Sequence, residues 1–333
     1  MYDIPYHNVD LKHYSFLVTG GAGFIGSNLV EYLLKYNAGK VRILDNLSNG
    51  YFKNIEPFLS DSRVEYIEGD ITDEQVCQRC CEGINIVFHQ AALGSVPRSI
   101  QNPIASNAAN VTGFLNMLVA AKDKKVERFI YASSSSVYGD DNTLPKVENR
   151  IGQPLSPYAV TKRVNELYAQ VFGNTYDMKT IGLRYFNVFG PKQNPKNPYA
   201  AVIPLFIDAI LNNRPAKIFG DGNQSRDFTF VENAVQANIK AAFTTNEKAF
   251  NQVYNIAFGS TISVNELFEA ISALAGSKIR PVYSEPRKGD IKDSLADISK
   301  AKELLGYNPL FNVHQGLKIL FDWYQRNISF IEK

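Results

Sequence analysis

A tyrosine and a lysine four positions apart, Tyr158 and Lys162, are well suited to acid–base chemistry. Residues at this spacing share one helix face, so the phenol and the ammonium can point into one site. A phenol is a weak base at neutral pH because its reference pKa is about 10, and nearby positive charge lowers that pKa. Ser134, at the end of a predicted strand, can hydrogen-bond the same substrate hydroxyl. Together these side chains can take a proton from an alcohol while a nicotinamide accepts the hydride.

A strand, a tight turn and a helix near the start of the chain predict where that nicotinamide cofactor binds. The apolar run Phe16–Val18 leads into the turn Thr19–Gly26, TGGAGFIG, and an amphipathic helix over Ser27–Lys35 follows. Glycines at such a junction let the backbone turn sharply and approach a pyrophosphate, whose charge is received by the N–H groups at the helix start. The stretch predicts a dinucleotide site.

Asp45 indicates which dinucleotide is bound. It follows a second predicted strand, Lys40–Leu44, at the place where a Rossmann unit binds the adenosine ribose through an acidic side chain. Its charge would repel a 2′-phosphate. The sequence therefore predicts NAD rather than NADP as the cofactor.

Strands and helices alternate along most of the chain, which predicts an α/β fold with a parallel sheet covered on both faces. We expect a Rossmann doubly wound domain over residues 1–188, with residues 229–258 returning to it. A smaller, interleaved α/β substrate domain is expected over residues 189–228 and 259–333, and its proline- and glycine-rich part from Pro191 to Arg226 is expected to wrap a ligand. Further predicted strands are Val64–Gly69, Ile84–His89, Arg128–Ala132, Thr180–Tyr185 and Val253–Ala257, and long helices are predicted at Asn107–Lys122 and Tyr158–Phe172.

Composition narrows the kind of protein. The net charge of +2 implies no nucleic-acid partner, and neither a signal peptide nor a run of about 18 apolar residues is present, so we expect a cytoplasmic protein without a membrane partner. The cysteines Cys77, Cys80 and Cys81 are expected to be reduced on a buried helix face, with no metal site. His89 ends a predicted strand and is expected to be a core histidine. Residues 1–14 are expected to lie across the body.

Several motifs resemble the extended short-chain dehydrogenase/reductase family over nearly the whole chain. They are TGGAGFIG, Asp45, Ser134 and the pair Tyr158-x-x-x-Lys162. Within that family, LRYFNVFGP, IFGDGNQSRDF and PRKGDI resemble the nucleotide-sugar enzymes. This resemblance implies a UDP- or dTDP-hexose held by Asn187. It also implies that Arg226 and Arg287 bind the phosphates and that Asp290 binds the ribose.

The motifs, the strand ends and the resemblance together give two sets of expected site residues besides the catalytic Ser134, Tyr158 and Lys162. The cofactor set is Gly20, Gly23, Phe24, Ile25, Asp45, Asn46, Asn49, Gly50, Asp70, Ile71, Gln90, Ala91, Ala92, Tyr158, Lys162 and Tyr185. The substrate set is Gly94, Ser95, Ser134, Ser135, Ser136, Tyr158, Asn187, Ala201, Val202, Lys217, Phe219, Arg226, Arg287, Asp290 and Ser294.

The reaction is narrowed by two serines. Similar dehydratases carry an Asp-Glu pair just before the Val-Tyr-Gly of this loop, and similar decarboxylases keep the glutamate, whereas this chain has Ser135 and Ser136. Without either carboxylate, reversible oxidation at one carbon is the reaction that the resemblance implies, which favours a sugar 4-epimerase. Loss of Tyr158 or Lys162 would be expected in a non-catalytic NAD-sensing relative, and both are present.

The substrate is narrowed by Ser294. In similar galactose epimerases that exclude N-acetyl sugars a bulky tyrosine falls at this position, so a serine leaves room for a 2-acetamido group. The run Gly94–Ser99 and the N-terminal extension resemble bacterial UDP-N-acetylglucosamine 4-epimerases of polysaccharide synthesis. UDP-hexuronic acids, N-acetylated ones included, and UDP-glucose remain alternatives. Galactose epimerases carry a lysine beside the substrate at the position where this chain has Gly94.

The resemblance also implies a homodimer. In similar enzymes the helices that correspond to Asn107–Lys122 and Tyr158–Phe172 pair across a two-fold axis.

Overall fold

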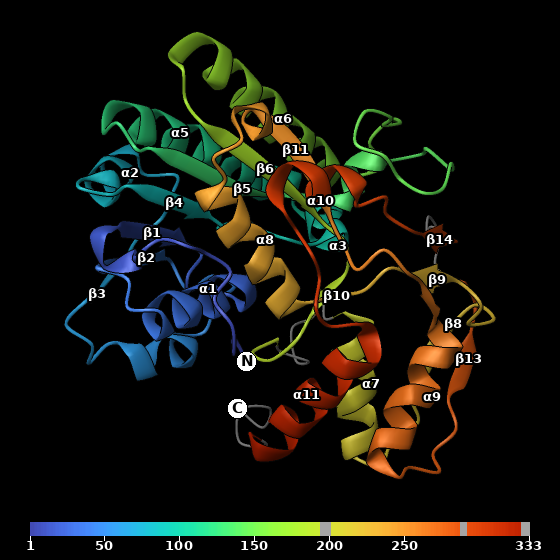
Figure 1. Ribbon diagram of the computed structural model, residues 1–333. Coiled ribbons are helices and arrows are strands. Elements are labelled where there is room, and N and C mark those ends of the chain that lie inside the picture. The colour runs from blue at the N-terminus through green and yellow to red at the C-terminus, as the bar shows by residue number, and fades with distance from the viewer. Residues whose placement is uncertain (194–200, 287–291, 328–333) are drawn as a thin grey trace.

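A parallel sheet with the strand order β11-β6-β5-β4-β1-β2-β3 forms the centre of the computed structural model, which describes residues 1–193, 201–286 and 292–327 (Figure 1). The order reverses between β1 and β4, where a doubly wound sheet opens a crevice for ligands. The predicted Rossmann-like α/β fold is confirmed. The strands are β1 Ser15–Thr19, β2 Lys40–Asp45, β3 Val64–Glu68, β4 Ile86–His89, β5 Arg128–Ser134, β6 Thr180–Tyr185 and β11 Gln252–Ile256.

Helices bury both faces of this sheet (Figure 1). Because successive strand residues point to opposite faces, Phe16 and Val18 pack under α1 and α8, while Leu17 packs under α2 and α5. The helices of this part are α1 Phe24–Lys35, α2 Glu74–Cys81, α3 Val96–Gln101, α4 Pro103–Asn107, α5 Gly113–Asp123, α6 Pro157–Tyr176 and α8 Val231–Phe243. Short 3-10 turns occupy Leu11–His13, Phe52–Asn54, Glu56–Phe58, Ser135–Tyr138 and Glu247–Ala249.

A second, smaller hydrophobic core lies beside the first at the lower right of Figure 1. It is built mainly from α7 Val202–Leu211, α9 Val264–Ala275 and α11 Val313–Arg326. Three small sheets accompany this part: β7 Val188–Phe189 with β10 Thr229–Phe230, β8 Lys217–Phe219 with β13 Val282–Ser284, and β9 Ser225–Arg226 between β12 Ile262–Ser263 and β14 Asp293–Ser294.

Two features of the smaller part differ from the sequence expectation. The segment expected to wrap a ligand contains α7, whose Ile203, Phe206 and Ile207 are buried in the second core. The helix α10, Ser299–Leu305, and its flanks over residues 296–307 pack into the first core instead of the smaller domain to which residues 259–333 were assigned. Burial of Ile298 and Leu305 against α8 and β11 accounts for this placement.

The predicted helix over Asn107–Lys122 is interrupted by a π-helical turn at Ala108–Thr112. This wider turn carries the buried Asn110, whose amide accepts from Leu93 N at 2.7 Å and donates to the Thr161 hydroxyl at 3.1 Å. π turns are frequent near functional sites, and Leu93 lies in the loop that follows β4.

One helical stretch, Pro103–Asp123, is long and apolar enough by length and composition to cross a membrane. It comprises α4, the π turn and α5, and 44% of its most apolar window is buried in the protein. Contacts of α5 with α2 and α6 account for that apolar composition, as in the core helix of a globular fold.

The N-terminal extension lies across the body, as expected. Tyr2 is buried, and its backbone N–H donates to Glu232 of α8 at 2.6 Å while its hydroxyl donates to Asn28 of α1 at 2.8 Å. Tyr6 also donates its hydroxyl to Glu232 at 2.6 Å. The extension therefore joins the two helices that cover one face of the sheet.

Candidate active site

The glycine turn after β1 brings the start of α1 to the crevice between β1 and β4. Gly20 has φ of +67°, and a Cβ there would lie 2.7 Å from the backbone nitrogen of Ala91. Gly23 donates its backbone N–H to Gly20 O at 3.0 Å and is the N-cap of α1. Only glycine permits these close approaches, so the turn leaves backbone N–H groups facing the crevice.

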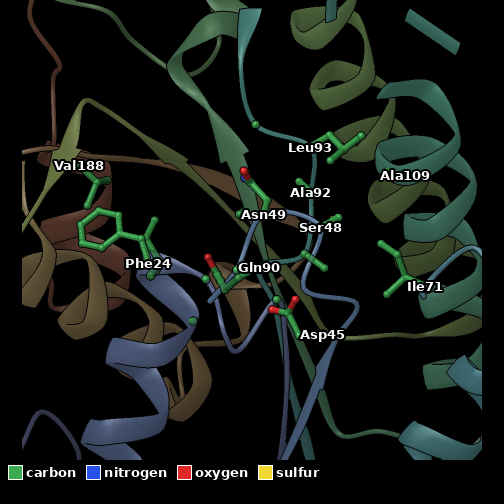
Figure 2. A pocket seen from close by; sticks show the side chains of 18 of the residues that line it. Phe24, Asp45, Ser48, Asn49, Ile71, Gln90, Ala92, Leu93, Ala109 and Val188 are labelled. Carbon is green, nitrogen blue, oxygen red and sulfur yellow. The ribbon is translucent and has the colours of Figure 1, made fainter. Parts of the chain in front are cut away.

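Asp45 lies at the end of β2, beside this turn. Its carboxylate accepts backbone N–H groups from Ala22 at 2.9 Å and Leu47 at 2.8 Å, and Figure 2 shows it at the cavity wall. Burial raises the pKa of Asp45, and the backbone N–H groups act in the opposite direction. Beside it Asn46 donates to Asp70 at 2.7 Å, which ties the ends of β2 and β3 together.

The proposed acid–base residues meet where α6 begins over the end of β5. Ser156 caps α6, and Tyr158 donates its backbone N–H to the Ser99 hydroxyl at 3.0 Å. Lys162 donates Nζ to Ala132 O at 2.7 Å and lies 6.0 Å from the centre of the Tyr158 ring. Ser134 ends β5, and its hydroxyl is hydrogen-bonded to Tyr158. The structure thus brings Ser134, Tyr158 and Lys162 together, as the sequence predicts.

The protein alone does not lower the pKa of Tyr158. Burial raises that pKa, and the hydrogen bond from Ser134 opposes the rise. The lowered pKa of Tyr158 that the sequence predicts is therefore not reached in the protein alone, although the Lys162 ammonium lies 6.0 Å from the ring centre. Burial lowers the pKa of Lys162 to about 8, so its ammonium is mostly protonated at neutral pH.

The glycine turn and Tyr158 line the same cavity, which has a volume of about 420 Å³. Figure 2 shows part of its wall, including Phe24, Asp45 and Gln90. Every residue of the predicted cofactor set lines it. From the predicted substrate set, Gly94, Ser134, Tyr158, Asn187 and Ala201 line it as well.

Other lining residues were missed by the sequence analysis. Lys192 follows the Gly190-Pro191 turn and pairs with Glu31 at 2.7 Å, and its position after a motif was an available signal. Ala109 lies in the π turn, where a small apolar side chain gives no signal. Gly26 also lines the cavity and belongs to the predicted glycine turn, although the cofactor set did not name it. The missed lining residues are Leu44, Ser48, Tyr51, Gly69, Leu93, Ala109, Ala132, Ser133, Val188, Lys192 and Gln193.

Some predicted substrate residues do not line this cavity. Ser95 caps α3, and Ser294 lies opposite Arg226 in the register of β14 and β9. Arg287 and Asp290 fall outside the described residues. The set described outside the cavity is Ser95, Ser135, Ser136, Val202, Lys217, Phe219, Arg226 and Ser294.

The positions of the acidic side chains in the cavity bear on the type of reaction, because a dehydratase needs carboxylates near Tyr158 as further acid and base groups. Among the described residues lining the cavity, the carboxylates are Asp45, which ends β2, and Asp70, which follows β3. Ser134 on β5 is three strand positions from Asp45, or about 14 Å at the usual strand spacing of about 4.8 Å. Neither acid can transfer a proton beside Tyr158.

His89 and the cysteines lie outside this chemistry. His89 is buried in the core with its Nδ1 at 2.9 Å from the Thr19 hydroxyl, and burial followed by the charge of Lys162 lowers its pKa to about 3. Cys77, Cys80 and Cys81 are buried free thiols on α2, as expected, and burial raises the pKa of each.

Comparison with known proteins assigns this arrangement to a family. Residues 16–257 match the NAD dependent epimerase/dehydratase family. The chain belongs to that family. The match includes the glycine turn, Asp45, Ser134, Tyr158 and Lys162.

Family members of similar sequence and structure act on nucleotide sugars. A putative UDP-glucose 4-epimerase of Methanocaldococcus jannaschii is 39% identical over 93% of this chain and 98% of its own. The UDP-N-acetylglucosamine 4-epimerase of Methanobrevibacter ruminantium, solved with UDP-N-acetylmuramic acid, is 40% identical with a TM-score of 0.89 over 94% of this chain and 98% of its own. The UDP-glucuronic acid 4-epimerase of Bacillus cereus, solved with its sugar nucleotide and NAD, is 31% identical with a TM-score of 0.85 over 94% and 99%.

The cofactor of this family member is NAD, and the residues present fit it. A Cβ at Gly20 would meet the backbone of Ala91, and one at Gly26 would meet the backbone of Gly20, so glycine at both positions keeps the turn close to the start of α1. The N–H groups there suit a pyrophosphate. Asp45 is placed to bind the adenosine ribose. When bound beside Tyr158, NAD supplies a hydride acceptor and a positive charge.

Proposed function

We propose that the protein is a UDP-hexose 4-epimerase that interconverts UDP-N-acetylglucosamine and UDP-N-acetylgalactosamine in the cytoplasm, for surface polysaccharide synthesis. The observation that carries the 4-epimerase assignment is the meeting of Ser134, Tyr158 and Lys162 in a cavity whose described acids lie at the far strands β2 and β3. Reversible oxidation needs one base and a hydride acceptor, whereas loss of water needs further acid–base groups.

Tyr158 takes the proton of the sugar 4-hydroxyl in this mechanism, and Ser134 holds that hydroxyl by a hydrogen bond. NAD held by the glycine turn and Asp45 would accept the C4 hydride of the sugar and return it, so the oxidation would be reversible and need no other redox partner. The 4-keto sugar would turn about its bond to the diphosphate between the two transfers. Tyr158 then returns the proton to the C4 oxygen, with Ser134 holding that oxygen by a hydrogen bond.

The acetamido sugar is the favoured substrate for two reasons. Ser294 is small where similar galactose epimerases carry a tyrosine, and the Methanobrevibacter enzyme of 40% identity acts on UDP-N-acetylglucosamine. UDP-glucuronic acid and UDP-glucose are the alternatives, because relatives of similar length act on them.

The proposal is tested by incubating the purified protein, without added NAD, with UDP-N-acetylglucosamine, UDP-glucose and the two matching uronic acids. The C4 proton of each sugar is followed by NMR. We expect epimer from the acetamido sugar at the highest kcat/KM. No epimer from any sugar would reject the 4-epimerase, and a higher kcat/KM on a uronic acid or UDP-glucose would reject the substrate assignment.

Ser294→Tyr is expected to lower kcat/KM for UDP-N-acetylglucosamine at least tenfold while UDP-glucose turnover stays within about twofold. In the similar galactose epimerases a tyrosine at this position excludes N-acetyl sugars, so a phenol here is expected to block the 2-acetamido group and to leave a 2-hydroxyl untouched. The matched control is Ser225→Tyr, next to Arg226 on the paired strand β9, which is expected to affect both sugars alike. Equal loss on both sugars in Ser294→Tyr would show that Ser294 does not select the substrate.

A homodimer is part of the proposal. Val160, Leu167 and Val171 form an exposed apolar stripe on α6, with Val171 54% exposed, and Ile104 of the adjoining α4 is 82% exposed. We expect Val171→Arg to give a monomer in size-exclusion chromatography with light scattering. Leu274→Arg, on the exposed side of α9, is the control and should stay dimeric. A Val171→Arg protein of unchanged mass would exclude this surface.

A further inference from the structure

A buried ion pair lies directly under the acid–base residues, and the mechanism above does not use it. Glu166, one turn after Lys162 on α6, is 4% exposed, and its partner Arg184 on β6 is 1% exposed. The two form a fork, with Arg184 Nε at 2.8 Å from Glu166 Oε1 and Arg184 Nη2 at 2.9 Å from Oε2. Burying such a pair costs free energy, and replacing one with apolar side chains is often neutral or stabilising, so stability alone is weak grounds for its presence.

We propose that Glu166 is a positioning residue of the active site. It holds the end of β5 in register with α6, and it supplies the negative charge that keeps the Lys162 side chain positively charged. It touches neither sugar nor cofactor, so both effects act through Ser134 and Lys162. The inference concerns the proton-transfer residues of the proposed epimerase and rests on that function.

The register argument starts from β5 and β6. Ser133 and Arg184 are partners across these parallel strands, and both donate to Glu166 Oε1, Ser133 at 2.6 Å. One turn earlier, Lys162 donates to Ala132 O at 2.7 Å. Consecutive turns of α6 are therefore bonded to consecutive residues of β5. Ser134 directly follows Ser133 on β5, and Tyr158 lies one turn before Lys162 on α6, so these contacts hold together the two segments that carry Ser134 and Tyr158.

The charge argument concerns the surroundings of Lys162, which is 2% exposed. Burial lowers its pKa to about 8, and the charge of Glu166 acts against that change. From β4 the group facing Lys162 is His89, which is neutral because its own pKa is about 3. From α6 itself the neighbours are the Tyr158 phenol and Glu166.

The remaining charged groups of this network are guanidinium groups. Arg184 of β6 and Arg163 of α6 both donate to Glu166, Arg163 at 3.0 Å, and Arg184 also lies 4.9 Å from the Tyr138 ring. Removing the carboxylate would leave two cations without their partner near Lys162. Loss of an attractive charge and exposure of like charges both favour a neutral lysine.

The decisive experiment titrates Lys162 directly by NMR of ¹³C-labelled lysine in the protein without sugar nucleotide, with Lys162→Arg to assign the signal. Glu166→Gln is expected to lower the titration midpoint of Lys162 by about one pH unit, a tenfold loss in proton affinity. Glu166→Asp keeps the charge and is expected to restore the native midpoint. An unchanged midpoint in a folded Glu166→Gln protein would overturn the charge argument.

Two milder variants keep the proposal testable if Glu166→Gln fails to fold. Arg163→Met removes a part-exposed cation from Glu166 and should raise the Lys162 midpoint, because the carboxylate is then less neutralised. Ser133→Ala removes the bond to β5 and should lower kcat severalfold with a native Lys162 midpoint and pH profile. A lowered or unchanged midpoint in Arg163→Met, or native kcat in Ser133→Ala, would contradict the proposal. If the midpoints shift as expected but no sugar is turned over, the proposed function alone fails.

Discussion

Tyr158→Phe is expected to lower the rate of sugar epimerisation by about 10³-fold while NAD stays bound. Phenylalanine keeps the aromatic ring in the first turn of α6 but removes the hydroxyl oxygen that takes the proton of the sugar 4-hydroxyl. A general base contributes a factor of about 10² to 10⁴ to the rate. The backbone N–H bond from residue 158 to the Ser99 hydroxyl is retained. The loss should therefore fall on kcat, with little change in KM or in melting temperature.

The matched control makes the same substitution elsewhere in the same cavity. Tyr51→Phe removes a phenol oxygen from the lining near the Asn49 loop, away from Ser134 and Lys162, and should stay within about threefold of native kcat. Rates are measured as epimer formed under saturating substrate, and bound NAD is measured after heat release. A Tyr158→Phe enzyme within tenfold of native kcat would mean that another group takes the proton.

Local patterns in the sequence predicted the sheet, and they named as acid–base residues three side chains that line one cavity of the structure. The glycine turn, Asp45 and the Tyr158–Lys162 pair each depend on neighbours a few positions away, and strand ends of a parallel sheet must gather at one edge. The chain therefore carries those features as short-range spacing. The helix α7 was readable in the same way, because Ile203, Phe206, Ile207 and Ile210 follow a helical period. The surrounding prolines and glycines obscured that period.

The features that could not be predicted from the sequence depend on contacts between residues far apart in the chain. Lys192 lines the cavity where it pairs with Glu31, a residue far away in the chain. Ala109 lines it from the π turn Ala108–Thr112, whose Asn110 is hydrogen-bonded to Leu93. Neither contact leaves a short-range pattern in the sequence. Residues 296–307 join the first core because Ile298 and Leu305 meet α8 and β11, far away in the chain. The direction of the Tyr158 pKa shift was likewise set by burial, which three-dimensional structure alone reveals.

Gly26→Ala is expected to reduce NAD affinity about 100-fold, or about 2.8 kcal/mol. A Cβ at this position would lie 2.1 Å from the carbonyl oxygen of Gly20 and 2.8 Å from its carbonyl carbon, both of them backbone atoms that cannot rotate away. The start of α1 would have to move off the turn. Its N–H groups and positive dipole would then be displaced from the pyrophosphate that they are placed to bind.

Gly94→Ala is the matched control for Gly26→Ala. Gly94 lines the same cavity, but an added Cβ there has no atom within 4 Å and its φ is ordinary, so NAD should be retained. Affinity is measured by calorimetry on protein stripped of NAD, and stability by the melting temperature of that same form. Overpacking of about 1–3 kcal/mol should lower the melting temperature of Gly26→Ala as well. Native NAD affinity in Gly26→Ala would mean that the turn and α1 can separate without loss of the site, and the close approach at Gly20 would then not be what positions the cofactor.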